Sequence, residues 1–249
     1  MAVQGRFTWF ELVTPDVDDG RAFWSEVTGL AESSMDTGGS TYRMLTQGER
    51  PVAGIVAPRM DNVPPQWLSY WEFTDIDERV AAAKKNGGTV IVPPTDIPVG
   101  RFAILGDPQG AVFALFKSTD ASNEPGDAFH WNELWAKDAD AVLSFYRKSI
   151  GVTLDEMAQP MPGGGTYHLF KFDGALVGGA LTSPNAQATA MWLPYVKVDD
   201  VDAAVARAKK LGGRVIAEVM DVETVGRFGI VADRQGAVLG LIRPSPAAA

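Results

Sequence analysis

An internal repeat that covers nearly the whole chain is the strongest constraint on what its 249 residues can fold into. Residues 100–117 read GRFAILGDPQGAVFALFK, and residues 226–243 read GRFGIVADRQGAVLGLIR, with ten of the eighteen aligned positions identical. Residues 9–16, WFELVTPD, return at 131–138 as WNELWAKD. The offset between matching residues drifts only from 122 to 126, so we expect two tandem copies of one domain.

The repeat also sets the expected domain boundaries. We expect a first domain at residues 1–117, a linker at 118–128, a second domain at 129–243 and a tail at 244–249. The linker contains the sequence STDASNEPGD, which is polar and includes Pro and Gly, as is typical of a connecting segment. Apolar residues make up 46% of the chain, which is enough for each domain to build a core.

Hydrophobic periodicity and turn residues predict the elements of each copy. In the first copy the expected strands are 8–14, 41–45, 52–56, 68–74, 89–93, 101–105 and 111–117, and the expected helices are 18–29 and 77–86. Asp16 or Asp18 is the expected N-cap of the first helix, and Gly29 is its expected end. The sequence DPQG at 107–110 predicts a hairpin loop, because its Gly tolerates a positive φ.

The composition narrows the classes of function. The net charge of −9 argues against a nucleic-acid partner, because such a surface needs Lys and Arg to replace phosphate counterions. No apolar stretch is long enough to span a bilayer, and the N-terminal sequence lacks the basic and apolar regions of a secretory signal. The absence of Cys excludes disulfides and thiolate metal ligands. We therefore expect no membrane partner and a cytoplasmic location.

The paired βαβββ pattern, which closes on a strand–DPxG–strand hairpin, resembles the vicinal oxygen chelate superfamily. Its members include glyoxalase I, extradiol dioxygenases, and fosfomycin and bleomycin resistance proteins. The segments WFEL, AKKNGG and GRFAILGDPQGA are most similar to its two-domain bacterial glyoxalase-like members, and the resemblance covers about residues 5–243. It implies an α+β fold of two tandem domains. Each domain would consist of paired βαβββ modules that form a cupped, mixed or antiparallel sheet with the helices outside.

Metal-using members of this superfamily bind a divalent ion through His, Gln or Glu on the first strand of a module and Glu on its last strand. Alignment of the helices and hairpins places these positions at Trp9, Leu68, Trp131, Leu193, Ala114 and Gly240. None of these side chains can ligate a divalent ion, which needs nitrogen, oxygen or sulfur donors. The chain has only two His residues, His130, which we expect at the surface, and His168. We therefore expect no metal site and no cofactor.

Side chains alternate between the two faces of a strand, and this predicts which residues line each cupped sheet. If Trp9 faces the cavity, so does Glu11, while Phe10 and Leu12 face the helix. The other residues expected to face a cavity are Tyr70, Glu72, Ala114 and Phe116 in the first copy and Trp131, Glu133, Trp135, Tyr195, Lys197 and Gly240 in the second. Because two of these positions hold only Ala and Gly, we expect open space there. Such aromatic pockets suit a small organic ligand.

Glu11 and Glu133 are the candidate catalytic residues, because each is the carboxylate on the opening strand of its copy. Burial disfavours the charged form of a carboxylate, so either residue could act as a general acid or base. The structural alternative is an ion pair with Arg6, Arg43 or Arg101.

Further candidate binding residues also have a structural alternative. Arg101 and Arg227 each follow a Gly at a strand start and would either hold an anionic group at the pocket rim or brace the adjoining hairpin. Tyr42 and Tyr167 follow Gly-rich turns and are expected at the lip of a pocket. His168 is the candidate imidazole for proton transfer, or a structural residue.

Two functions of different classes fit these pockets. The first is a metal-free enzyme of detoxification or secondary metabolism, of isomerase, lyase or hydroxylase type, in which a cavity Glu moves a proton next to a carbonyl. The alternative is a binding protein that sequesters a toxic or antibiotic compound, as bleomycin-resistance relatives do. A third option is a protein whose duplicated domains serve assembly. The replacement of Glu72 by Lys197 between the copies leaves open whether one or both cavities are active. We expect a monomer or homodimer whose partner is a small organic molecule.

Overall fold

The computed structural model describes residues 4–120, 126–158, 165–185 and 187–246. Part of the expected linker, at 121–125, and part of the expected tail, at 247–249, lie outside these described residues.

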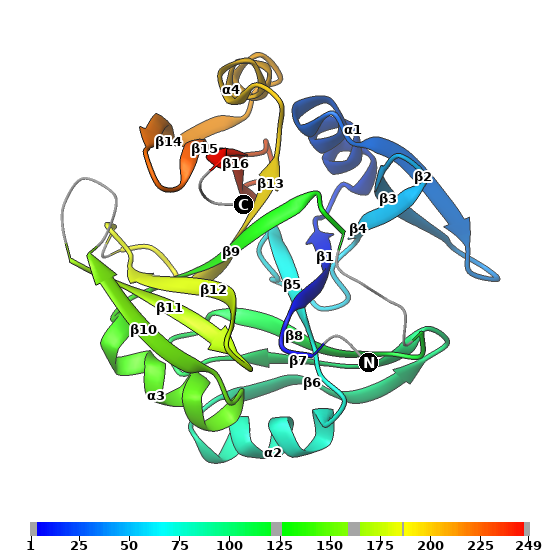
Figure 1. Cartoon of the computed structure of the whole chain (residues 1–249). Coiled ribbons are helices and arrows are strands. Elements are labelled where there is room, and N and C mark those ends of the chain that lie inside the picture. The colour runs from blue at the N-terminus through cyan, green and yellow to red at the C-terminus, as the bar shows by residue number, and fades with distance from the viewer. Residues whose placement is uncertain (1–3, 121–125, 159–164, 186, 247–249) are drawn as a thin grey trace. The chain divides into compact units, whose positions relative to one another are not determined.

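The helices and strands follow the same order in the two repeats (Figure 1). The first repeat contains β1 (Phe7–Val13), α1 (Val17–Thr28), β2 (Ala31–Asp36), β3 (Thr41–Gln47), β4 (Arg50–Val56), β5 (Gln66–Glu72), α2 (Ile76–Lys85), β6 (Thr89–Ile97), β7 (Gly100–Gly106) and β8 (Val112–Ser118). The second contains β9 (Phe129–Ala136), α3 (Ala139–Ser149), β10 (Thr153–Ala158), β11 (Thr166–Phe172), β12 (Ala175–Thr182), β13 (Met191–Lys197), α4 (Val201–Lys210), β14 (Arg214–Val222), β15 (Gly226–Ala232) and β16 (Val238–Pro244).

Helix α1 begins and ends at the residues that its sequence predicts. The carboxylate of Asp16 accepts a hydrogen bond from the backbone N of Asp19 at 3.0 Å, which satisfies one of the free N–H groups of the first turn. Gly29 follows the helix with a φ of 77°, a conformation that costs a residue without Cβ little. Of the two predicted N-caps, Asp16 is the one observed, and the predicted end at Gly29 is confirmed.

One strand of the first module was not predicted. The sequence of β2, AESSMD, has no alternation of buried apolar residues, and five of its six side chains are exposed. It is an edge strand that pairs with β3, so backbone hydrogen bonds rather than burial hold it in the sheet. With β2 present, each module has the βαβββ order.

The strands form two eight-stranded sheets, in the orders β2-β3-β4-β1-β5-β8-β7-β6 and β10-β11-β12-β9-β13-β16-β15-β14. Both sheets are mixed, because the first strand of each module pairs with its last strand in parallel while neighbouring hairpin strands are antiparallel. Each helix packs on the strands of its own module and lies outside the sheet. The predicted α+β fold of paired βαβββ modules is confirmed.

Tertiary contacts divide the chain into two compact units, which are described separately. Unit 1 contains Met1–Thr8, Ser69–Pro125 and Asn132–Trp192, and unit 2 contains Trp9–Leu68, Gly126–Trp131 and Leu193–Ala249. Each unit therefore combines a module from the first repeat with one from the second. Helix α2 packs beside α3 in unit 1, and α1 packs beside α4 in unit 2 (Figure 1).

The repeated DxQG hairpin joins the two modules of each unit. In unit 1, Asp107 Oδ1 accepts backbone hydrogen bonds from its own loop, and Oδ2 accepts one from the hydroxyl of Tyr146 on α3 at 2.9 Å. In unit 2, Asp233 Oδ1 likewise accepts bonds from its loop, and Oδ2 accepts one from the indole of Trp24 on α1 at 2.9 Å. Burial raises the pKa of both carboxyls above the ordinary Asp value.

The Gln of the same hairpin holds the loop that precedes the partner module's helix. Gln109 Oε1 accepts hydrogen bonds from the backbone N of Lys137 at 2.7 Å and of Asp138 at 3.0 Å. Gln235 Oε1 accepts one from the backbone N of Asp16 at 2.8 Å, and its Nε2 donates one to the carbonyl of Asp16 at 2.9 Å. The motif is therefore repeated because each unit needs one such junction between repeats.

Each unit has an aromatic core. In unit 1 the fully buried Trp71 stacks on Phe7 with 4.5 Å between ring centroids, and its indole N donates to the carbonyl of Gly5 at 2.8 Å. Further rings around it include Phe73, Phe113, Tyr146 and Trp192. In unit 2 the buried rings include Phe10, Phe23, Trp24 and Trp67.

Candidate active site

A carboxylate and a phenol meet on the opening strand of the first repeat. The hydroxyl of Tyr42 on β3 donates a hydrogen bond to Glu11 Oε1 on β1 at 2.8 Å. The indole N of Trp9 lies 3.3 Å from the Tyr42 oxygen and donates to it. Trp9 and Glu11 are half-buried, whereas the intervening Phe10 is buried, as the predicted alternation of faces requires. We call Trp9, Glu11 and Tyr42 the first cluster; all three belong to unit 2.

The second repeat builds a matching group in unit 1. The hydroxyl of Tyr167 on β11 donates to Glu133 Oε1 at 2.8 Å, and the indole N of Trp135 donates to Glu133 Oε2 at 2.5 Å. All three side chains are buried. We call Glu133, Trp135 and Tyr167 the second cluster. Both expected catalytic carboxylates thus lie beside a tyrosine that the sequence placed at a pocket lip.

Two glycines make the tyrosine–carboxylate contacts fit. Gly54 on β4 is directly opposite Glu11, and Gly179 on β12 is directly opposite Glu133. A Cβ at Gly54 would clash with the ring end of Tyr42, and a Cβ at Gly179 would clash with the ring of Tyr167. Sequence reasoning missed both glycines, although VAG at 52–54 matching VGG at 177–179 is a signal that could have found them.

The phenol of the first cluster is a hydrogen-bond donor at physiological pH. Burial raises the pKa of Tyr42 well above its ordinary value, and the neighbouring Glu11 charge raises it further. Tyr42 therefore stays protonated and holds one oxygen of the Glu11 carboxylate in place.

A Gly54→Ala variant is expected to displace Tyr42 from Glu11, because the added methyl occupies the position of the ring end. The displaced phenol would then ionise near its ordinary pKa of about 10. Spectrophotometric titration of tyrosinate should show one more titrating tyrosine than in the unchanged protein. Gly106→Ala is the matched control, because a Cβ there would meet its nearest atoms at an ordinary 3.7 Å. An unchanged titration in Gly54→Ala would contradict the role of the glycine.

Glu72 is a buried carboxylate with its own hydrogen-bond donors in unit 1. The hydroxyl of Thr8 donates to one of its oxygens at 3.1 Å, and the backbone N of Ser118 donates to the other at 2.8 Å. Burial raises its pKa, although both donors act in the opposite direction. These bonds join three strands, so they give Glu72 a structural role. Its counterpart Lys197 forms an ion pair with Asp127 in unit 2.

Open space was expected at Ala114 and Gly240, and at Gly240 a ring of the protein fills it. The ring of Tyr195 lies where a Cβ of Gly240, directly opposite on β16, would be placed. The small residue thus accommodates a neighbouring ring of the protein, which corrects the expected vacancy at Gly240. At the other position Ala114 is fully buried opposite Tyr70, whose ring contacts Phe116 edge to face at 6.3 Å.

The two candidate anion-binding arginines hold helix N-termini. Arg101 forms a bidentate pair with Asp77 on α2, at 3.0 and 3.1 Å, and also contacts Asp96 at 2.8 Å. Arg227 forms the equivalent bidentate pair with Asp202 on α4, at 2.6 and 2.7 Å, and also contacts Asp221. These contacts are structural, but they brace a helix and the preceding strand rather than the hairpin that follows. Arg43, another candidate partner for Glu11, lies 3.7 Å from Asp18.

Within the described part of the chain, neither histidine is among the hydrogen-bond partners found for the carboxylates of the two clusters. His168 is buried on β11, and its Nε2 is 3.2 Å from Asp140 on α3. Since its neighbour Tyr167 points to the opposite face, the imidazole of His168 faces the helix and not Glu133. His130 is half-buried, and burial, with the nearby Lys197 charge, lowers the pKa of its imidazole. Trp131, next to it, is also half-buried.

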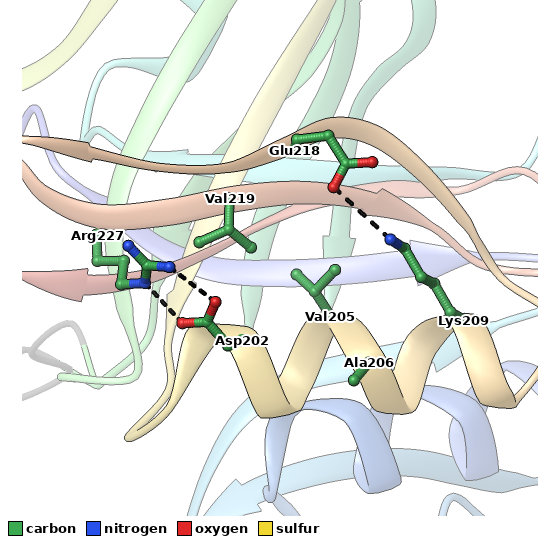
Figure 2. A pocket seen from close by; sticks show the side chains of 7 residues that line it. All are labelled: Asp202, Val205, Ala206, Lys209, Glu218, Val219 and Arg227. Carbon is green, nitrogen blue, oxygen red and sulfur yellow. Dashed lines mark hydrogen bonds and ion pairs between the residues drawn. The ribbon is translucent and has the colours of Figure 1, made fainter.

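A groove of about 330 Å³ opens in unit 2 between α4 and the strands β14 and β15 (Figure 2). Its apolar floor is lined by Val205, Ala206 and Val219. The charged groups at its ends are already paired, Asp202 with Arg227 at one end and Lys209 with Glu218 at the other, as Figure 2 shows. The groove contains neither carboxylate–phenol cluster, and its paired charges present no reactive group.

The donor set does not fit the divalent ion that the family resemblance implies. The side chains at the six ligand positions, Trp9, Leu68, Trp131, Leu193, Ala114 and Gly240, offer no lone pair to a cation. Within the described residues, no three His, Asp or Glu side chains come close enough together to hold a metal ion. Among these same residues no helix is long and apolar enough to cross a membrane.

Comparison with known proteins agrees with the fold. The model of the Glyoxalase/Bleomycin resistance protein/Dioxygenase superfamily matches residues 6–115 and 128–241, so the chain belongs to this superfamily. "Putative glyoxylase CFP32" of Mycobacterium tuberculosis (strain CDC 1551 / Oshkosh) is 34% identical over 98% of this chain and 96% of that protein. "Anthracycline biosynthesis protein DauV" of Streptomyces sp. (strain C5) is 35% identical over 48% of this chain and 44% of that protein.

Solved structures share the architecture at low identity. The Mn(II)-bound glyoxalase from Novosphingobium aromaticivorans has a TM-score of 0.64 and 15% identity, with 98% of this chain and 85% of that chain covered. A mutant of 4-hydroxymandelate synthase from Streptomyces coelicolor has a TM-score of 0.63 and 11% identity, with 97% and 93% covered. These likenesses show the fold alone.

Proposed function

We propose that the chain is a glyoxalase-like enzyme of detoxification or secondary metabolism that acts on a small organic molecule without a metal ion or cofactor. The observation that supports this proposal is the tyrosine–carboxylate contact that both repeats build at the same place, Tyr42 with Glu11 and Tyr167 with Glu133. In both repeats a glycine directly opposite the carboxylate leaves room for the tyrosine ring.

The chemistry proposed for this site is proton transfer next to a carbonyl. The Glu carboxylate takes a proton from the carbon, the C–H electron pair forms a C=C bond, and the carbonyl π pair moves onto the oxygen. The protonated Glu then returns the proton to a neighbouring atom of the resulting enolate. The tyrosine hydroxyl orients the carboxylate and stays protonated. An isomerase- or lyase-type step of this kind balances without an oxidant, so we favour it over a hydroxylase-type step.

The relatives give this proposal its direction. The name of CFP32, which aligns along nearly the whole chain, includes glyoxylase, and that of DauV, which aligns with about half of it, refers to anthracycline biosynthesis. Substrates with carbonyl groups next to exchangeable C–H bonds are consistent with both names. The metal ligands of the family are replaced here by indole and aliphatic groups, so we assign the proton transfer to the glutamates.

The test measures how fast the C–H hydrogen next to a carbonyl is replaced by solvent deuterium. The exchange is monitored by proton NMR in D₂O with excess EDTA. The probes are the hemithioacetal of methylglyoxal with glutathione and 2-hydroxyacetophenone. We expect exchange by the unchanged protein and a loss of about 100-fold or more in the Glu11→Gln, Glu133→Gln double variant. Single variants report whether one or both clusters act.

Glu218→Gln is the control, because Glu218 is an exposed carboxylate outside both clusters and is paired with Lys209. Exchange that persists in the double variant would assign the chemistry elsewhere. Exchange that EDTA abolishes would mean that a metal ion takes part, and exchange of neither probe would count against the enzyme.

A second candidate function is sequestration of a toxic or antibiotic compound. Glu133 favours it, because its two oxygens already accept hydrogen bonds from Tyr167 and Trp135. These bonds hold the carboxylate in a fixed position, where it can anchor a ligand as well as react. Retention of a compound without exchange or turnover would support this function.

The remaining expectations belong to this proposal. We propose a cytoplasmic protein that is a monomer or homodimer and does not bind nucleic acid, as the net charge of −9 suggests. Native mass spectrometry of the purified protein tests the assembly state and any retained ligand.

A further inference from the structure

Each repeat places an exposed methionine beside its carboxylate–phenol cluster. Met35 on the edge strand β2 is directly opposite Tyr42 on β3, and Met157 on the edge strand β10 is directly opposite Tyr167 on β11. Directly opposite residues of antiparallel strands project from the same face, with Cβ atoms about 5 Å apart. Each methionine therefore lies on the face of the sheet that carries the Glu of its cluster.

Both methionines are large apolar side chains that are exposed on edge strands. Met35 is 47% exposed and Met157 is 39% exposed, and the other residues of β2 are small or polar. When AESSMD of β2 is aligned with TLDEMA of β10, the methionine is the only identical residue. The two edge strands have diverged everywhere except at the position that faces the tyrosine.

The hydrogen bonds within the clusters determine which polar groups a ligand needs. An ionised carboxylate only accepts hydrogen bonds. In the first cluster the hydroxyl hydrogen of Tyr42 is already directed at Glu11. A ligand that reaches Glu11 or Glu133 must therefore supply its own donor, and a cationic amine would also be attracted by the carboxylate charge. The net charge of the chain, −9, favours the same sign of ligand.

We propose that Met35 and Met157 form the apolar walls of two ligand sites, one for each repeat, and that each site takes a flat apolar molecule bearing a cationic amine. The thioether is polarisable and flexible, so it packs on aromatic faces of varied outline. The Glu of the cluster anchors the amine, and the methionine covers the ring system. This inference rests on the proposed function, because it uses the same clusters and names the class of ligand that they select.

The test is isothermal titration calorimetry with 9-aminoacridine, a flat dye that is cationic at neutral pH. We expect two molecules bound to each chain. Met35→Gln and Met157→Gln should each weaken one of the two sites about tenfold, and the double variant should weaken both. Met35→Leu should restore binding, since leucine keeps the apolar wall. Anthracene-9-carboxylate, a flat anion, should not bind.

Met60→Gln is the matched control, because Met60 is 49% exposed but lies between β4 and β5, outside both clusters. Circular dichroism checks that the glutamine variants keep their fold. Absence of aminoacridine binding would overturn the inference. So would binding that the double methionine variant leaves unchanged, or that Met60→Gln weakens equally.

The two proposals fail in different ways. If the Glu variants lose proton exchange while the Met variants bind the dye normally, the proposed enzyme stands and the methionine walls do not. If the Met variants weaken dye binding and the unchanged protein exchanges neither carbonyl probe, the ligand sites stand and the proposed chemistry does not.

Discussion

The Asp233→Asn variant should unfold at pH 7 with a free energy lower by about 2–3 kcal/mol, whereas Asp107→Asn should lose only about 1 kcal/mol. The two expected losses differ because Asp233 accepts a hydrogen bond from an indole, whereas Asp107 accepts one from a phenol. Trp24 Nε1 can only donate, so an amide NH₂ turned toward it leaves two donors facing each other. The oxygen of Tyr146 already accepts from the indole of Trp192, but its second lone pair can still accept from an amide at position 107.

Urea unfolding followed by tryptophan fluorescence measures both losses, and equal m-values ensure that the comparison concerns stability. If both variants lost the same free energy of unfolding, the difference between an indole and a phenol donor would not explain the stability of these contacts.

The pH dependence provides an independent check on Asp233. Burial raises its pKa above the ordinary 3.8. A carboxyl whose pKa is higher in the folded state stabilises the fold fully below the unfolded-state pKa, and this contribution is lost as the pH rises through the folded-state pKa. The variant cannot titrate at this position. Its deficit against the unchanged protein should therefore shrink from about pH 4 upward and become constant above the raised pKa.

The Trp71→Ala variant should lose about 3–5 kcal/mol of unfolding free energy, because it leaves a cavity in the middle of the unit 1 core. Trp71 is fully buried, stacks on Phe7 and donates to the carbonyl of Gly5. Thermal and urea unfolding should both show the loss, and it should be among the largest for a single substitution in this chain.

Paired phenylalanine variants separate packing from hydrogen bonding. Trp71→Phe removes the donor to Gly5 and leaves that buried carbonyl without it. Trp67 is also buried, but its Nε1 has no hydrogen-bond acceptor within the part of the chain that the structure describes. Trp67→Phe should therefore cost less than Trp71→Phe. The reverse order would show that ring size, and not the indole N–H, dominates at these sites.

Much of the fold could be predicted from the repeat and from local signals. Asp16 and Gly29 mark the ends of α1, because capping depends on a few neighbouring residues. Alternation along β1 correctly placed Trp9 and Glu11 on one face, since a strand with one buried face fixes its register. The edge strand β2 escaped prediction because it buries almost nothing.

The features that sequence reasoning missed depend on contacts between distant strands. Gly54 and Gly179 matter only because a tyrosine ring from the adjacent strand crosses them. Similarly, Tyr195 covers Gly240 from the neighbouring strand, which no local pattern reveals. The face on which His168 lies could not be fixed in advance, because the strand register was unknown. Which module would pair with which was also undetermined, since the copies carry the same hairpin and helix signals.

The junctions between repeats constrain how this sequence can change over evolutionary time. Trp24 and Asp233 form one hydrogen bond although 209 positions separate them, and Tyr146 and Asp107 form another across 39 positions. Because each bond joins the hairpin of one repeat to a helix of the other, a substitution on one side changes a contact of the other repeat. A truncation that discards either repeat would therefore remove a module from both units.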